Sequence, residues 1–376
     1  MEPIEKVFHD KLINDDLDAD FLQVYSDWLQ ERNDPRGELI ALKLALESGD
    51  AGSRQAIETR LALLKADSER ALGIPDDLVI GLTWTAGVVT RINVHQKECL
   101  ERLGYFIQQS EHFSFLTDLS LSGMDLDTVP EWVTQLRQLT ALDLSGNQLT
   151  SLPDSLGQLS QLAKLDLGRN DLTSLPESLG QLNQLTDLRL SCNDLPPLAP
   201  LLDSLGKLSQ LTCLFLDGNN LAFLPDSLGL LRQLNQLHLD GNYLTSLPDF
   251  LGQLGQLTYL DLSQNHLMSL PDSLGQLNQL TTLYLWDNDL TSLPDSLGQL
   301  SRLTELDLRG NKLASLPDSL GQLSQLTELD LSENQLASLP DSLGQLSQLT
   351  ELDLRGNKLK GVPLSLLRLN QLEILL

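Results

Sequence analysis

The sequence predicts a curved α/β solenoid with a parallel sheet on its concave face, preceded by a small helical domain and a β-hairpin cap. Three observations lead to this prediction. A 23-residue unit recurs from Leu116 onward. Part of each unit alternates apolar and polar residues, as a strand does. The 23-residue Leu frame is missing before Leu116, where helical spacing appears. We therefore expect a helical domain over 1–77, a capping hairpin and helix over 78–115, and repeats over 116–376.

Three segments near the N-terminus have amphipathic spacing typical of helices. They read "DADFLQVYSDWLQERND", "PRGELIALKLALES" and "SRQAIETRLALLKADSERAL". Pro35 favours a helix start and Gly73 a helix end. The segments therefore predict a small helical domain.

The next segment, "DDLVIGLTWTAGVVTRINVH", alternates and turns at Thr85–Ala86–Gly87, which predicts a β-hairpin. Its second arm carries Val89, Ile92 and Val94 in the strand frame of the repeats, 27 residues before Leu116. With a return helix over 96–110, this arm forms a divergent unit ahead of the first repeat. The hairpin would then cover the sheet edge.

The repeat frame LxxLxLxxNxLxxLPxxLxxLxx predicts one short strand and one tight return. In one copy, Leu306 and Leu308 point inward by strand alternation. Their neighbours Glu305, Asp307 and Arg309 point outward. The following LPDSLGQLSQL spaces Leu by three, which suits a 3₁₀ or helical turn entered through Pro. Only stacked neighbours can bury these leucines, so the units must form a continuous core.

Ten asparagines mark the copies, and a buried carboxamide at a strand end can both donate to and accept from unpaired backbone groups. All steps between them are 23 residues except one of 26. Met124 takes the marker position in an earlier copy, which gives eleven repeats, and "NQLEILL" starts a twelfth. We expect a structural role for Asn147, Asn170, Asn193, Asn219, Asn242, Asn265, Asn288, Asn311, Asn334 and Asn357.

Over residues 116–376 this frame resembles the leucine-rich repeat family, in particular its 23-residue class with LPxxL, such as the plant intracellular Ras-group-related repeat proteins. The resemblance implies protein binding. Separately, "VYSDWLQERNDPRGELIALK" is similar to the short domain ahead of repeats in some bacterial proteins, whose hallmark resembles YADWLEERGDPRGE. That likeness implies a bacterial source and no chemistry. We interpret Trp28, Asp34 and Arg36 as a packed ring and a capped helix junction, with an interaction site as the alternative.

Composition narrows the partner classes. With 52 acidic and 25 basic residues the net charge is −27, which argues against nucleic acid and anionic membrane surfaces as partners. The charged start "MEPIEKVFHDKLINDD" and the lack of a long apolar run predict a cytoplasmic protein without a membrane segment. Cys99, Cys192 and Cys213 match no zinc spacing and are expected to be free thiols.

No catalytic motif is recognisable. Phosphate-binding loops, zinc-protease helices, nucleophile elbows and dinucleotide fingerprints are all missing from the sequence. A pair of His238 and His266 on adjacent repeats would lack a third ligand. The remaining histidines, His9, His95 and His112, are scattered. We therefore expect no enzyme activity, no metal and no cofactor.

Aromatic residues replace polar ones at outward strand positions in repeats five to eight, while Leu keeps every inward position. These rings should form one band on the concave face: Phe215, His238, Tyr259, Tyr284 and Trp286. Tyr243 and His266 follow marker asparagines. A rim of Asp217, Asp240, Asp261 and Asp287 favours a ligand with Lys or Arg at its edge. We predict a partner-binding site here, with cross-strand stabilisation as the alternative.

Two further features stay open. The three extra residues in "NDLPPLAPLLDSLG", with Pro196, Pro197 and Pro200, form either a bulge beside this site or a neutral insertion. The column of Asp307, Asp330 and Asp353 is either a second site or a means of keeping the face soluble, with Arg309 and Arg355 near enough to pair.

The last segment, "QLEILL", has no polar cap, so its apolar edge is weakly capped, covered by a partner or covered by a second copy. The oligomeric state is open. Alternatives to a concave binding site are therefore a structural protein that self-associates through its ends, or a regulator of a small GTPase.

Overall fold

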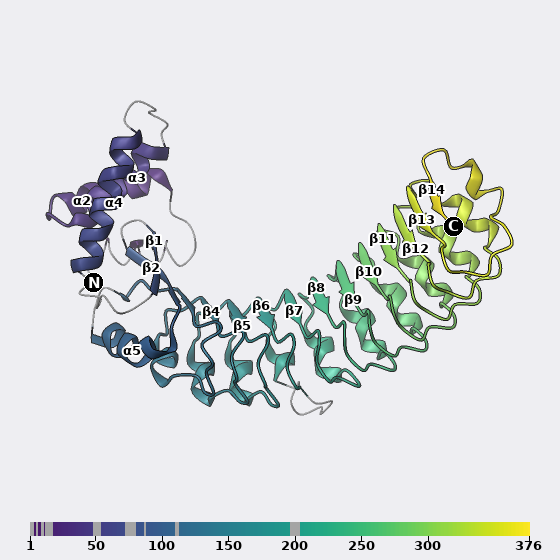
Figure 1. Cartoon of the computed structure of the whole chain (residues 1–376), viewed down its shortest axis with the longest axis horizontal. Coiled ribbons are helices and arrows are strands. Elements are labelled where there is room, and N and C mark those ends of the chain that lie inside the picture. The colour runs from purple at the N-terminus through teal and green to yellow at the C-terminus, as the bar shows by residue number, and fades with distance from the viewer. Residues whose placement is uncertain are drawn as a thin grey trace. The chain divides into compact units, whose positions relative to one another are not determined.

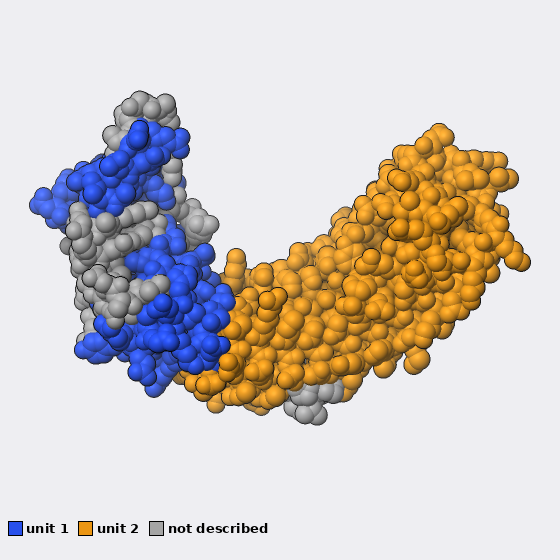
Figure 2. Space-filling model, viewed as in Figure 1, with its two compact units in different colours: residues 1–126, 130–144 blue, residues 127–129, 145–376 orange. Residues whose placement is uncertain are grey.

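The computed structural model of the chain (Figure 1) describes residues 4, 7–8, 11, 18–47, 54–71, 80–85, 88–109, 113–195 and 204–376. Two compact units make up the chain (Figure 2): unit 1 is Met1–Leu126 with Pro130–Leu144, and unit 2 is Asp127–Val129 with Ser145–Leu376. Several expectations fall outside the described residues: the hairpin tip at Ala86–Gly87, Gly73, His9, His112, and the insertion with Pro196, Pro197 and Pro200.

Unit 1 contains the three expected N-terminal helices, α2 (Ala19–Gln30), α3 (Pro35–Glu47) and α4 (Arg54–Ala71). Helix α2 begins after Asp18, whose carboxylate accepts a hydrogen bond from the Phe21 amide at 2.6 Å, as an N-cap does. The Ser26 hydroxyl donates to the Gly37 carbonyl at 2.7 Å and thereby ties α2 to α3. The apolar faces of α2 and α3 pack with Phe8 and Phe115 into one small core.

Trp28, Asp34 and Arg36 have structural contacts. The Trp28 ring stacks on Tyr25 at 5.8 Å, and the Arg32 guanidinium lies 3.9 Å from its centre. The Asp34 carboxylate accepts from the Arg36 amide at 2.9 Å and pairs with its guanidinium at 2.6 Å, where α3 begins. These contacts agree with the interpretation as a packed ring and a capped junction.

The predicted hairpin is present as β1 (Ile80–Thr85) and β2 (Val88–Val94), which pair antiparallel. Strand β2 also pairs in parallel with β3 (Asp118–Ser120), with Ile92 opposite Leu119, so it occupies the strand position one unit earlier. A short 3₁₀ helix, η1 (Lys97–Cys99), and α5 (Leu100–Gln109) form the expected return. After η3 (Glu131–Gln135), β4 (Ala141–Asp143) pairs with β3.

Unit 2 repeats one short parallel strand and one 3₁₀ helix. In Figure 1 its strands line the inner side of a curve and the 3₁₀ helices line the outer side. Strand order follows chain order. The strands are β5 (Lys164–Asp166), β6 (Asp187–Arg189), β7 (Cys213–Phe215), β8 (Gln236–His238), β9 (Tyr259–Asp261), β10 (Thr282–Tyr284), β11 (Glu305–Asp307), β12 (Glu328–Asp330), β13 (Glu351–Asp353) and β14 (Glu373–Leu375). The 3₁₀ helices are η4 (Asp154–Gln158), η5 (Glu177–Gln181), η6 (Leu205–Lys207), η7 (Asp226–Leu230), η8 (Asp249–Gln253), η9 (Asp272–Gln276), η10 (Asp295–Gln299), η11 (Asp318–Gln322), η12 (Asp341–Gln345) and η13 (Leu366–Arg368).

The leucines form the continuous core that the repeat frame predicts. Leu283 in the middle of β10 lies opposite Leu260 on one side and Leu306 on the other. All three are at most 1% exposed. Burial of one such side chain contributes about 1.5–3 kcal/mol, so the stack supplies the main stabilisation of each repeat. None of the helices in the described ranges combines the length and apolar character needed to cross a membrane.

The marker asparagines connect consecutive repeats through buried hydrogen bonds. Asn288, which is 6% exposed, accepts from the Leu267 amide at 3.0 Å and donates to the Leu262 carbonyl at 2.9 Å. Both of these leucines belong to the preceding repeat. The same carboxamide donates to Leu285 of its own repeat at 3.1 Å. The pattern recurs at Asn242, Asn265, Asn311 and Asn334.

We expect Asn288→Ala to lower the free energy of unfolding by about 3 kcal/mol, because it leaves several buried backbone groups without partners at about 1–3 kcal/mol each. Urea denaturation followed by circular dichroism measures this change. Thr291→Ala, at an exposed position of the same repeat, is the control. A loss for Asn288→Ala no larger than that of the control would contradict the assignment.

The glycine of each SLGQL segment allows the outer side to pack closely. A Cβ on Gly298 would overlap the carbonyl of Ser319 in the next repeat, whereas a Cβ on Gly255 would meet nothing within 4 Å.

We therefore expect Gly298→Ala to lower the unfolding free energy by about 1–3 kcal/mol through overpacking. Gly255→Ala is the matched control and should be neutral or slightly stabilising. Both are compared by thermal unfolding. Equal thermal unfolding midpoints for the two variants would show that the close approach at Gly298 does not affect stability.

Candidate functional site

Four rings are in contact across four adjacent strands on the inner side of unit 2. Phe215 stacks on His238 with centroids 4.1 Å apart, and His238 lies 4.6 Å from Tyr259. Tyr259 meets Tyr284 edge-on at 5.6 Å. All four side chains are half-buried. We name Phe215, His238, Tyr259 and Tyr284 the ring ladder.

The contacts of the ring ladder are partly diagonal. Phe215 lies directly opposite His238, but Asp261, not Tyr259, is the register partner of His238. The same Asp261 lies opposite Tyr284. Phe215, His238 and Tyr284 therefore occupy the third positions of their strands, whereas Tyr259 occupies the first position of β9. This brings Asp261 beside the rings instead of leaving it in a separate column.

Polar groups hold both ends of the ring ladder. The Arg189 guanidinium lies 4.7 Å from the centre of the Phe215 ring and pairs with Asp187 at 3.3 Å. At the other end the Tyr284 hydroxyl donates to Glu305 at 2.6 Å. Burial, followed by this hydrogen bond, raises the pKa of Tyr284. Sequence reasoning missed Arg189, although it occupies the outward position one repeat before Phe215.

The other expected aromatic residues lie apart from these ring contacts. Trp286 follows Tyr284 by two residues and its ring centre lies 4.8 Å from the Arg309 guanidinium. Tyr243 and His266, both exposed, face each other at 6.0 Å in the turns after the strands. The described ring contacts therefore place the expected residues in three groups, where the sequence predicts one band of five and two flanking positions.

An acidic group borders the ring ladder. The Asp217 carboxylate accepts from the Ser191 hydroxyl at 2.6 Å, and the Asp261 carboxylate accepts from the Ser263 amide at 3.0 Å. Burial raises the pKa of Asp240 to about 6, and the charges of Asp261 and Asp217 add to this effect. Burial also lowers the pKa of His238, against the opposite influence of these two carboxylates.

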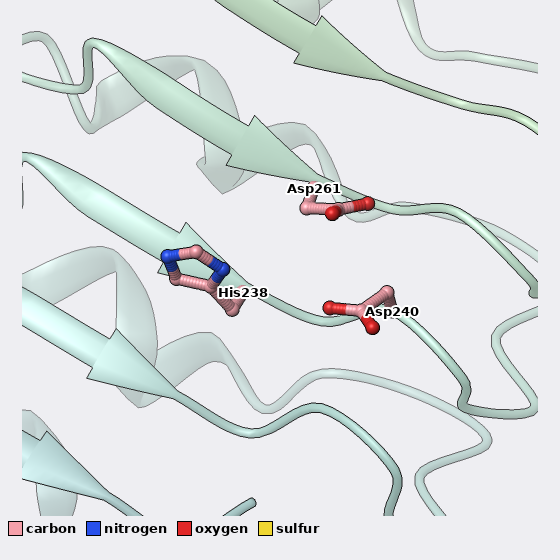
Figure 3. A group of neighbouring side chains, drawn as sticks. All are labelled: His238, Asp240 and Asp261. Carbon is pink, nitrogen blue, oxygen red and sulfur yellow. The ribbon is translucent and has the colours of Figure 1, made fainter. Parts of the chain in front are cut away.

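His238, Asp240 and Asp261 converge, and a donor atom from each lies within 4.8 Å of the others (Figure 3). Within the described part of the chain, Asp217, Asp240 and Asp261 form no ion pair with Lys or Arg. Asp287, the fourth expected rim residue, is exposed in a turn with a φ of 55°.

The aspartate column beyond the ring ladder behaves differently. Asp307, Asp330 and Asp353 are register partners on β11, β12 and β13. Arg355 pairs with Asp353, and this hydrogen bond holds the pKa of Asp353 below its ordinary value. Arg309 lies 3.4 Å from Asp307, yet burial outweighs this contact and raises the pKa of Asp307 to about 6.

The three cysteines are free thiols, as expected: Cys99 is buried, Cys213 is half-buried and Cys192 is exposed.

Family models match most of the repeat region. A model described as a leucine-rich repeat region matches residues 94–212 and 248–333, and a leucine rich repeat model matches residues 324–376. The chain therefore belongs to the leucine-rich repeat family. A search of the curated proteins found no match.

Solved structures of the same fold come from several kinds of protein. The plant peptide hormone receptor RGFR1, solved in complex with RGF2, is 29% identical over 70% of this chain and 44% of its own, with a TM-score of 0.61. The functional domain of InlJ from Listeria monocytogenes is 29% identical over 70% of this chain and 54% of its own, with a TM-score of 0.59. This chain thus spans only about half the length of each.

A third structure contains the leucine-rich repeats of FLRT2 in an octameric complex with Latrophilin 3 and Unc5D. That chain is 25% identical over 65% of this chain and 76% of its own, with a TM-score of 0.56.

The pKa of Asp307 predicts a pH dependence of stability. Because its folded-state pKa is about 6 against an ordinary 3.8, the folded chain binds more protons in this window. The contribution of Asp307 to the free energy of unfolding is therefore largest below the ordinary pKa of 3.8 and is lost as pH rises through the folded-state pKa of about 6. We expect Asp307→Asn to stabilise the chain by about 1 kcal/mol at about pH 8, and by less at about pH 4.

Urea denaturation at both pH values measures this difference, with the exposed Asp226→Asn as the control for charge removal. An Asp307→Asn effect that grows toward low pH would have the wrong sign for a raised pKa.

Proposed function

We propose that the chain is a non-enzymatic interaction module that binds a protein or peptide on the inner face of unit 2, at the ring ladder and its acidic border. One observation carries this proposal: four rings touch one another on a face where the core does not need them. Leu214, Leu237, Leu260 and Leu283 fill the inward positions of the same strands and are at most 1% exposed. Half-buried Tyr and other rings are typical anchors of interfaces.

The chemistry of the border favours a basic ligand. Asp217, Asp240 and Asp261 lie beside ring faces, so a Lys or Arg side chain there would gain ion-pair and cation–π interactions together. The net charge of −27 acts in the same direction at long range and favours encounter with basic partners. It also disfavours nucleic acid and anionic membranes.

The comparisons support the general mode of action. RGFR1 is described in complex with RGF2, and FLRT2 in complex with two other proteins. We extend this to the present chain as binding without catalysis. A cytoplasmic location and a bacterial source belong to the same proposal, supported by the free thiols and the likeness of residues 24–43 to a bacterial domain.

Self-association is the second candidate. Leu364, Leu367 and Leu376 are 72%, 61% and 76% exposed in the last repeats. Light scattering over a range of concentrations distinguishes this candidate, since a constant monomer mass removes it.

We expect replacement of Phe215, Tyr259, Tyr284 and Trp286 by Ser to weaken the binding of basic peptides by about tenfold or more, because it removes several buried contacts of an interface. The assay uses an array of peptides of equal length that are rich in Lys and Arg, rich in Asp and Glu, or neutral. Retention by the intact chain is compared with retention by the variant.

The control variant, Leu230→Ser with Phe250→Ser, alters apolar residues of η7 and η8 on the outer side. Circular dichroism verifies that each variant is folded. Equal retention by both variants, or preference for the acidic peptides, would place the site elsewhere or assign it another ligand.

A further inference from the structure

Three metal-binding side chains converge because of the strand register. His238 is the last residue of β8, and Asp240 follows two residues later in the segment after the strand. Asp261 is the direct partner of His238 on the next strand. Figure 3 shows the imidazole and the two carboxylates turned toward one shared space.

The distances between the three donor atoms fit a bound ion if the side chains move slightly closer together. One donor atom from each side chain lies within 4.8 Å of the others. Two donors bound tetrahedrally to Zn²⁺ at 2.0–2.2 Å would be separated by ~3.4 Å. All three side chains are half-buried and lie outside the leucine core, so a closure to that spacing leaves the core packing unchanged.

Neighbouring groups hold two of the three ligands in place. The His238 ring is fixed between Phe215 at 4.1 Å and Tyr259 at 4.6 Å. The Asp261 carboxylate is anchored through the Ser263 amide at 3.0 Å. Such outer contacts orient metal ligands and reduce the entropy lost on binding.

A buried hydroxyl gives a second, independent observation. The Ser263 side chain is fully buried, and its hydroxyl has no hydrogen-bond partner in the described residues. A buried polar group without a partner is unusual and requires an explanation. The Gly241 amide donates to the Ser263 carbonyl at 3.0 Å, so Ser263 lies next to the turn that carries Asp240. An unpaired buried hydroxyl therefore lies in the repeat of Asp261, beside the turn that carries Asp240.

The local charge also favours a cation. Asp217, Asp240 and Asp261 bring three carboxylates together without an ion pair to Lys or Arg in the described ranges. One imidazole with two carboxylates is a donor set for a divalent transition ion, since imidazole suits zinc and its neighbours, whereas magnesium and calcium prefer oxygen alone.

We propose that His238, Asp240 and Asp261 bind a divalent transition ion of the zinc type on the inner face of unit 2. Three protein donors leave a fourth position open toward solvent, as in zinc sites that accept an outside ligand. This inference goes beyond the proposed function, because the ion binds the chain alone. It also departs from the expectation of no metal, which considered only a pair of His238 and His266. His266 instead faces Tyr243 and lies 3.6 Å from Asp289.

The test is a calorimetric titration of Zn²⁺ into the full chain, after removal of any affinity tag and treatment with a chelator. We expect one ion per chain. His238→Phe keeps a ring between Phe215 and Tyr259 while removing both nitrogens, and Asp261→Asn removes one carboxylate charge. Each should weaken Zn²⁺ binding by about tenfold or more. Loss of an outer contact already lowers metal affinity by about this factor, and loss of a ligand should lower it at least as much.

Two matched variants serve as controls and should bind as the intact chain does. His266→Phe removes the exposed histidine of the next repeat, and Asp330→Asn removes a carboxylate at the same strand position as His238 in a repeat without histidine. Circular dichroism verifies folding. The proposal is overturned by the absence of saturable Zn²⁺ binding, by His238→Phe binding as tightly as the intact chain, or by Ca²⁺ or Mg²⁺ binding as tightly as Zn²⁺.

Discussion

The marker asparagines from Asn170 to Asn334 join their own repeats to the preceding ones through buried carboxamides, and the rest of unit 2 depends on this connection. A strand of three residues offers few ladder hydrogen bonds, so the strands alone would define the register weakly. Asn288 adds an accepted bond from Leu267 and donated bonds to Leu262 and Leu285, all between 2.9 and 3.1 Å. Because these groups are buried, any other register would leave them unpaired at a cost of several kcal/mol, on the order of 1–3 for each.

A fixed register separates the core from the inner face. The inward positions hold leucine in every strand from β5 to β13, so the outward positions of the same strands are free to vary without loss of core packing. This explains how Tyr284 and Asp307 can be register partners although one is aromatic and the other charged. The same freedom lets a few consecutive repeats assemble a site while their neighbours keep a uniform acidic surface.

The charges are distributed unevenly along the site that results. Arg189 lies against the first ring, Glu305 accepts a hydrogen bond from the last, and the carboxylates of Asp240 and Asp261 lie between them. Burial in this region opposes charge, as the raised pKa of Asp240 to about 6 shows. A bound cation, whether a basic side chain or a metal ion, would offset the cost of burying these carboxylate charges. The two proposals therefore draw on the same excess of negative charge but are separable, because one needs a partner and the other needs only the ion.

The sequence by itself determined the solenoid, the alternation that turns leucines inward, the marker asparagines, the hairpin ahead of the repeats and the face on which the aromatic residues lie. Local periodicity and an internal alignment of repeats encode all of these. Only the tertiary structure decided which outward side chains touch. The diagonal contact of His238 with Tyr259, the placement of Trp286 against Arg309 and the convergence of His238, Asp240 and Asp261 depend on side-chain rotamers and on the pairing between strands. A linear pattern records spacing along the chain, and it does not record the directions in which neighbouring side chains turn.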